Sequence, residues 1–170
     1  MPRPDLADAF AHHVWATLRL LDTCLTLTSE QLETAVPGTY GSILVTMRHT
    51  IGSDAWYLFT FSGDRSDLLD EDHMDLRELR DSMERHDAKW AELLARDLDP
   101  DTVLEEVDED DGYRKEATVG IRFAQALHHG TDHRSQICTA LTALGIEPPS
   151  IDAWEFGLVV GLVTETYPTT

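Results

Sequence analysis

Four long segments of this chain carry apolar residues three or four positions apart, which is the spacing of one face of an α-helix. In the first segment this stripe consists of Leu6, Phe10, Val14, Leu18, Leu21 and Leu25. The later segments repeat the pattern, so we expect long helices over residues 6–25, 42–61, 75–96 and 119–144. Because each helix has one stripe to bury, the pattern predicts an all-α protein with an up-and-down four-helix bundle.

A small β-hairpin is expected just before the fourth long helix. The runs Thr102–Val107 and Tyr113–Thr118 flank Asp110, Asp111 and Gly112. Asp-Gly between two such runs is a signal for a tight turn between antiparallel strands. We therefore expect a short two-stranded excursion from an otherwise helical fold.

A short fifth helix is expected at the end of the chain, over residues 151–165. Gly145 ends the fourth long helix, and Pro148 and Pro149 prevent its continuation. The inward face of the fifth helix is expected to consist of Ile151, Trp154, Leu158 and Leu162.

The chain has 170 residues, enough for a single domain over residues 1–170 that needs no disulfide bonds. Its 32 acidic residues outnumber its 13 lysines and arginines, for a formal net charge of -19. Such a field repels phosphate backbones and anionic lipids, which argues against nucleic acid and membranes as partners. The N-terminus lacks a signal-peptide pattern, and Cys24 and Cys138 fall in helical stretches, so we expect a cytoplasmic protein with free thiols.

Two histidines in the fourth expected helix stand out by their spacing. His129 and His133 are four positions apart, so both imidazoles can turn toward one metal ion. A buried histidine is also common as a hydrogen-bonded packing residue. Gly130 stands where the His-Glu-x-x-His metalloproteases have Glu, so the general base of that class is missing.

A third histidine, His49, lies at the edge of the apolar sector of the second expected helix. The second and fourth helices of a bundle can face each other, which would bring this imidazole to the pair. Three nitrogen ligands leave the fourth position of a four-coordinate ion to water or substrate, as in catalytic sites. The spacing therefore predicts a divalent metal centre made by His49, His129 and His133.

Several other polar residues are secondary candidates. His86, and more weakly His13, face inward and can serve as a further ligand, a proton shuttle or a hydrogen-bonded core histidine. Asp54 lies among apolar positions, where it can orient a ligating imidazole or pair with an arginine. Asp132 and Arg134 lie beside the expected ligands and can contact a substrate or face solvent.

The residues around His129 and His133 resemble those of a known protein family. The string Leu-His-His-Gly-Thr-Asp-His-Arg-Ser-Gln-Ile over residues 127–137 resembles the signature helix of the DinB/YfiT-like metalloprotein family. Residues 41–57 resemble the second helix of that family, and residues 151–156 resemble its C-terminal segment. The resemblance covers most of the chain, including the helix order and the strands before the signature helix.

The resemblance implies which residues bind the metal. In the family, the first histidine of the second helix and both histidines of His-x-x-x-His are ligands, which here correspond to His49, His129 and His133. Ser135 is a departure, since relatives often have Gly at that position. Imidazole ligands suit zinc, nickel, iron and copper, and zinc or nickel is the expected ion.

The resemblance also implies a metal-dependent enzyme, because characterised branches of the family transfer or conjugate low-molecular-weight thiols. An open metal site is consistent with this chemistry, since a divalent ion lowers the pKa of a bound thiol or water. The alternatives are a hydrolase that uses metal-bound water and a non-enzymatic metal- or small-ligand-binding protein of a stress response. The expected binding partner is a small-molecule substrate, such as a low-molecular-weight thiol. For the oligomeric state, a homodimer is left open as an alternative to a monomer.

Overall fold

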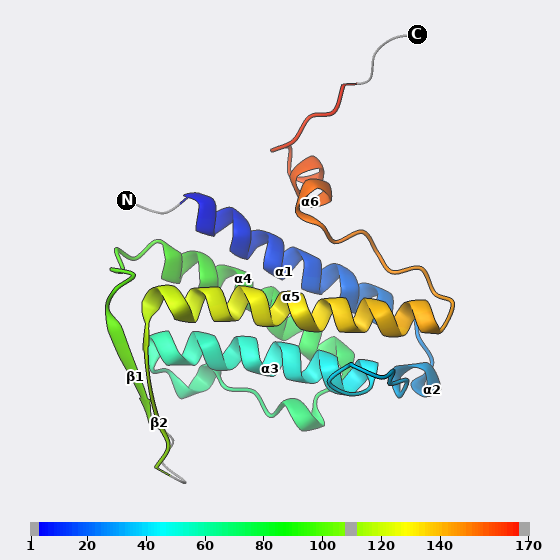
Figure 1. Cartoon of the computed structure of the whole chain (residues 1–170), viewed down its shortest axis with the longest axis horizontal. Coiled ribbons are helices and arrows are strands. Elements are labelled where there is room, and N and C mark those ends of the chain that lie inside the picture. The colour runs from blue at the N-terminus through cyan, green and yellow to red at the C-terminus, as the bar shows by residue number, and fades with distance from the viewer. Residues whose placement is uncertain (1–3, 108–111, 167–170) are drawn as a thin grey trace.

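The computed structural model describes residues 4–107 and 112–166 and is mostly helical, with a small two-stranded sheet (Figure 1). The long helices are α1 (Pro4–Cys24), α3 (Ile43–Ser62), α4 (Leu76–Leu94) and α5 (Val119–Ala143). The shorter elements are α2 (Ser29–Leu32), η1 (Arg65–Asp67), η2 (Glu71–His73), β1 (Val103–Val107), β2 (Arg114–Thr118) and α6 (Ala153–Val159). Each long helix begins and ends within two residues of its expected bounds, which confirms the helical periodicity.

Side-chain caps explain where the long helices begin and end. At the starts of α3 and α5, Ser42 and Thr118 each accept a hydrogen bond from the backbone N–H three positions later. At the start of α4, Asp75 and Glu78 each accept a backbone N–H of the other, which makes a capping box. Just after α5, Gly145 adopts a φ of +73°, a left-handed conformation that glycine takes without strain.

The four long helices pack side by side, with α1 and α3 each lying against both α4 and α5 (Figure 1). The stripes predicted from the sequence meet in a common core. Its largest fully buried apolar side chains are Phe10, Leu20, Leu21, Ile43, Met47, Ile51, Leu79, Met83, Trp90, Ile137 and Leu141. Within the described part of the chain, no helix is both long enough and apolar enough to cross a bilayer.

The helices do not alternate in direction as expected, because α3 and α4 run parallel. Near the start of α3, Arg48 donates a hydrogen bond to the carbonyl of Met74, which directly precedes α4. At the other end, Lys89 of α4 pairs with Asp67, which accepts a hydrogen bond from Ser62 at the end of α3. The predicted up-and-down order is therefore wrong at this connection.

The length of the connection explains the parallel pair. Residues 63–75 span up to about 40 Å when extended, whereas a helix of 20 residues such as α3 is about 30 Å long. The chain can therefore return along α3, through η1 and η2, before α4 begins.

The hairpin is confirmed. Strands β1 and β2 pair antiparallel, in a register that runs from Val103 opposite Thr118 to Val107 opposite Arg114. Two residues of the predicted turn, Asp110 and Asp111, lie outside the described residues.

Hydrogen bonds at Glu106 and Leu104 of β1 attach the hairpin to the helices. Glu106 of β1 accepts hydrogen bonds from the indole of Trp56 on α3 and from the guanidinium of Arg122 on α5. The strands therefore cover the ends of both helices that carry the predicted ligands.

The fifth predicted helix is present as α6, but it is shorter than expected and its buried face is different. Trp154 and Leu162, expected to face inward, are 73% and 62% exposed, and Leu158 is exposed too. The buried residues are Phe156 and Gly157, and the ring of Phe156 packs against His12 and Trp15 of α1. A seven-residue helix contacts few neighbours, so its docking on α1 selects the buried face rather than its own apolar stripe.

Candidate metal centre

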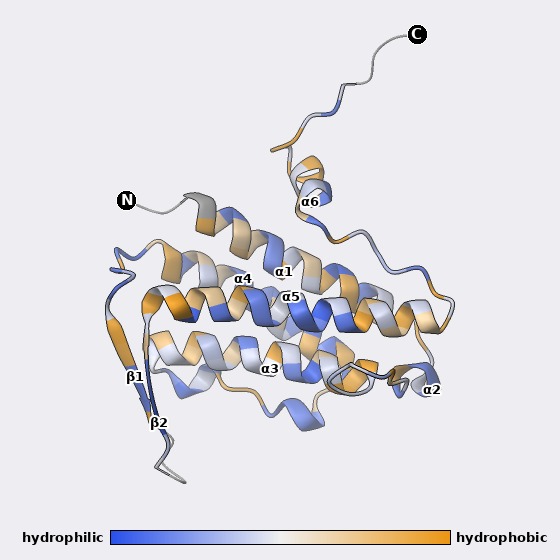
Figure 2. Cartoon of the chain, in the orientation of Figure 1, coloured by the Kyte–Doolittle hydropathy of each residue, from blue (hydrophilic) through white to orange (hydrophobic). Residues whose placement is uncertain are grey.

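The polar middle of α5 is the exception to the apolar packing, and Figure 2 shows it as a hydrophilic stretch between two more hydrophobic ends of the helix. This stretch contains His129 and His133, and His133 is buried. Buried polar groups cost free energy unless they find partners. The polar side chains in the middle of α5 therefore need partners on the helices that they face, α3 and α1.

His49 of α3 meets His129 and His133 of α5, as predicted. The Nε2 atom of His129 lies 3.1 Å from Nε2 of His49 and 3.1 Å from Nε2 of His133. One ring nitrogen from each residue lies within 4.8 Å of the other two. We call these three residues the histidine cluster.

The spacing of these nitrogens fits a divalent ion. Nitrogen ligands about 2.0 Å from a tetrahedral ion are roughly 3.3 Å from one another, close to the 3.1 Å separations in the cluster. Three imidazoles are also a donor set that zinc, nickel, iron and copper all accept. The cluster can therefore hold a metal ion, and the geometry leaves the identity of the ion open.

The surroundings keep the cluster in the form that binds metals. Burial lowers the pKa of His129 to about 4, with further lowering by the neighbouring His133 and His49. Burial, followed by the nearby His133, also lowers the pKa of His49. Both imidazoles are therefore neutral near pH 7 and present lone pairs, as ligation requires.

Gln136 selects the tautomer of His133. Its Oε1 atom accepts the backbone N–H of Tyr40 at 2.7 Å, and the same oxygen lies 3.3 Å from Nδ1 of His133. Because a carbonyl oxygen only accepts, Nδ1 of His133 must carry the proton. Nε2 of His133 is then left with a free lone pair that faces the cluster.

Two tyrosines border the histidine cluster. The ring of Tyr40 is stacked on His49, with centroids 4.1 Å apart, and it is edge-on to His133. On another side, Tyr57 lies edge-on to His129 at 5.7 Å. Tyr40 is 55% exposed, so this border of the cluster reaches solvent.

A second polar cluster lies in the interior and joins all four long helices. The carboxylate of Asp54 on α3 is 3.0 Å from Nε2 of His13 on α1 and 2.7 Å from Nδ1 of His86 on α4. It also accepts the indole N–H of Trp90 on α4, while Arg134 on α5 donates to Nδ1 of His13 at 2.9 Å. We call these five residues the Asp54 network.

The network is complete in its hydrogen bonding. Arginine only donates, so Nδ1 of His13 must accept, and its Nε2–H donates to Asp54. Burial alone would raise the pKa of Asp54, but the hydrogen bonds from His13 and His86 outweigh it and hold the pKa well below its ordinary value. Asp54 is therefore a carboxylate whose charge is balanced by Arg134 through the ring of His13.

These contacts correct the roles expected for two residues. Asp54 is predicted to orient a ligating imidazole or to pair with an arginine. Its hydrogen bonds instead go to residues outside the histidine cluster, and Arg134 reaches it only through His13. His86 is also predicted as a possible fourth ligand, but it is not in the group of residues that could hold an ion, and its Nδ1 atom bonds Asp54. The sequence pattern does not indicate these contacts, because the partners of Asp54 lie on two other helices, α1 and α4.

The network supports the helix that carries two of the ligands. A Cβ atom added to Gly130 would lie 2.4 Å from Cε1 of His13. The imidazole of His13 therefore packs directly on the backbone between His129 and His133, which only glycine permits here.

The remaining candidates divide between the interior and the surface. Arg134 is 3% exposed, and burial lowers its pKa to about 10, which still leaves it charged. Asp132 is exposed on α5. Three further residues at the cluster, Tyr40, Tyr57 and Gln136, were not identified from the sequence. Only Gln136 could have been found, because it follows His133 by three positions on the same helix and such residues are neighbours.

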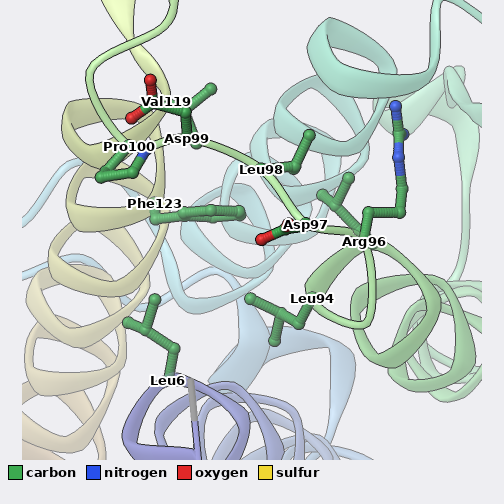
Figure 3. Close-up of a pocket in the computed structure, with 10 residues that line it drawn as sticks. Leu6, Leu94, Arg96, Asp97, Leu98, Asp99, Pro100, Val119 and Phe123 are labelled. Carbon is green, nitrogen blue, oxygen red and sulfur yellow. The ribbon is translucent and has the colours of Figure 1, made fainter. Parts of the chain in front are cut away.

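A further cavity is lined by no residue of either cluster. It has a volume of about 180 Å³ and lies where the ends of the helices meet the segment after α4 (Figure 3). Its lining residues are Leu6, Leu93, Leu94, Arg96, Asp97, Leu98, Asp99, Pro100, Val119 and Phe123. None of the predicted ligands or secondary candidates is among them.

Comparison with known proteins agrees with the resemblance seen in the sequence. The model of the DinB family matches residues 1–157, which include all three members of the histidine cluster. No curated protein matches the chain. Because the family match covers most of its length, the chain belongs to the DinB family.

Proposed function

We propose that this protein is a metal-dependent enzyme, built on a four-helix bundle with one parallel helix pair, that transfers or conjugates a low-molecular-weight thiol. The observation that carries the proposal is the convergence of three imidazole nitrogens beside a half-exposed tyrosine. His49, His129 and His133 would hold the ion, with zinc or nickel as the first candidates.

An open coordination position supports catalysis over a structural role. Structural zinc sites in proteins are closed by four protein ligands, whereas catalytic sites have three and keep one position for water or substrate. Three histidines form the cluster in the described residues. When bound, the ion supplies Lewis acidity that lowers the pKa of a coordinated thiol or water.

The residues around the cluster contribute binding and orientation. Gln136 holds the proton of His133 on Nδ1, so that Nε2 stays available. Tyr40 and Tyr57 supply aromatic walls against which the apolar part of a substrate can pack. The Asp54 network holds α5 against α1 and so keeps two ligands in place.

The first test is metal content. Purified protein should carry about one divalent ion per chain, the stoichiometry of one three-histidine site. Elemental analysis should show this metal falling away in His129→Ala. Full retention of the metal in His49→Ala, His129→Ala and His133→Ala alike would show that the cluster is not the site.

The second test concerns the reaction. With cobalt at the site, addition of a low-molecular-weight thiol should produce a sulfur-to-metal charge-transfer band and release a proton. The protein should also accelerate conjugation of such a thiol to an electrophile, and His133→Ala should abolish this. A silent spectrum together with thiol-independent hydrolysis would favour a hydrolase instead. Metal retention without either activity would favour a binding protein.

A further inference from the structure

We propose that the cavity between the hairpin, α3 and α5 binds the carboxylate end of the substrate whose other end reaches the histidine cluster. This inference rests on the proposed function, because it assigns a substrate class to the same centre. The cavity has a volume of about 320 Å³. Its lining residues are Trp56, Tyr57, Glu106, Lys115, Ala117, Ile121, Arg122 and Gln125.

The cavity begins where the histidine cluster ends. Tyr57, which lies edge-on to His129, also lines the cavity, and its hydroxyl accepts a hydrogen bond from Gln125 at 3.2 Å. Gln125 and His129 are one helical turn apart on α5, which places their side chains about 6 Å apart. A substrate can therefore pass along Tyr57 from one site to the other.

The charge of the cavity is opposite to that of the chain. The protein has a formal net charge of -19, yet two cations, Lys115 and Arg122, line this cavity against a single acid, Glu106. Strand register explains the grouping, because Glu106 and Lys115 are directly opposed and share the face of the hairpin that meets the helices. The surplus positive charge favours an anionic ligand.

Both cations have binding capacity left. Arg122 is 6% exposed, and its Nε atom is buried without a hydrogen-bond partner among the described residues. Its other nitrogens bond Glu106 and the carbonyl of Leu104. The ammonium of Lys115 is 3.8 Å from Glu106 and its side chain is 49% exposed, so this pair is loose and the ammonium can turn to a ligand.

Helix geometry sets the size of the ligand. Arg122 precedes His129 by seven positions on α5, which corresponds to about 10 Å along the axis. A molecule that fills both sites therefore has its carboxylate and its reacting atom about this distance apart, as in a short peptide. The aromatic rings of Trp56 and Tyr57 would cover its middle.

The test uses metal-free protein and S-methylglutathione, a peptide-sized acid whose capped sulfur offers no thiolate. Titration followed by NMR should shift the indole N–H of Trp56 saturably and leave that of Trp15, on α1, unchanged. Lys115→Met should weaken binding about fivefold, as expected for one partly exposed charge-assisted contact.

Arg114→Met is the matched control. It removes the same charge from the neighbouring position of β2, where the side chain pairs with Glu105 on the other face of the hairpin. Its affinity should stay within about twofold of the wild type, since that contact lies outside the cavity. Lys115→Arg should restore most of the binding.

Three outcomes would overturn the proposal: no saturable shift at Trp56, unchanged affinity in Lys115→Met, or equal loss in Lys115→Met and Arg114→Met. The last would mean a general effect of net charge. Because metal-free protein is used, failure of thiol chemistry at the histidine cluster cannot produce any of these results. The two proposals therefore fail separately.

Discussion

The histidine cluster and the Asp54 network are neighbours built from the same residue types, yet they differ in how their nitrogens are satisfied. In the network, the ring nitrogens that point inward meet a carboxylate or an arginine. In the cluster, three ring nitrogens point at one another. Lone pairs that converge repel unless a cation lies between them, so the cluster is arranged to receive an ion and the network is already complete.

The two regions also differ in charge. The network pairs one buried carboxylate with one buried guanidinium, so it is balanced without any ligand. The cluster is built from imidazoles, and the lowered pKa values of His49 and His129 keep these two neutral. The contrast indicates that the network contributes to folding, whereas the cluster contributes to binding.

The largest expected effect is on folding, from Asp54→Ala. Removing one partner of a buried ion-paired network leaves the other charge uncompensated and costs about 3–5 kcal/mol. Urea denaturation of metal-free protein should show this loss in the free energy of unfolding. Asp132→Ala, an exposed change on α5, is the control and should lie within about 0.5 kcal/mol of the wild type. A loss below 1 kcal/mol for Asp54→Ala would remove the distinction between the two regions.

The converse change, His129→Ala, should weaken metal binding by more than about 100-fold, since loss of a ligand exceeds the effect of removing a group that orients one. Its folding without metal should be nearly unchanged, because the core does not depend on the ion. Calorimetric titration with zinc and thermal melts will measure the two effects. Chelated wild type should keep its helical circular dichroism, and collapse of that signal would make the cluster structural.

Gln136→Leu should weaken zinc binding by about 10- to 100-fold, the usual range for a group that orients a ligating histidine. The variant keeps the volume of the side chain but removes the oxygen that accepts from His133. NMR of the imidazole nitrogens in metal-free protein should show His133 leaving its Nδ1–H tautomer. Gln136→Glu retains an acceptor and should restore the tautomer, and an unaltered tautomer in Gln136→Leu would contradict the assigned role.

The smallest effect concerns pH. The folded-state pKa of Asp54 is lowered, so its contribution to stability is complete above the unfolded-state value of about 3.9 and declines as pH falls through and below that value. Between pH 5 and pH 3.5, the stability advantage of the wild type over Asp54→Asn should shrink by about 0.7 kcal/mol. Denaturation at both pH values measures it. An advantage that grows on acidification would mean that Asp54 is protonated in the folded protein.

The metal centre was easier to predict from the sequence than the Asp54 network, because two of its three ligands lie close together along the chain. His129 and His133 are four positions apart on one helix, so their spacing alone places both side chains on the same face. His49 needed only the additional assumption that two helices face each other. The network could not be predicted, because Asp54 contacts partners 32 to 41 positions away, on the two helices α1 and α4.

The sequence by itself determined the long helices, the hairpin and the histidine pair, because each depends on residues a few positions apart and on backbone hydrogen bonding. Only the tertiary structure decided the parallel course of α3 and α4, the buried face of α6 and the partners of Asp54. A stripe of apolar residues specifies that a helix must be covered, and it does not specify which neighbour covers it or in which direction that neighbour runs. Those choices are made by contacts between distant residues, such as Arg48 with Met74 and His13 with Asp54, whose free energies are gained only once the helices have met.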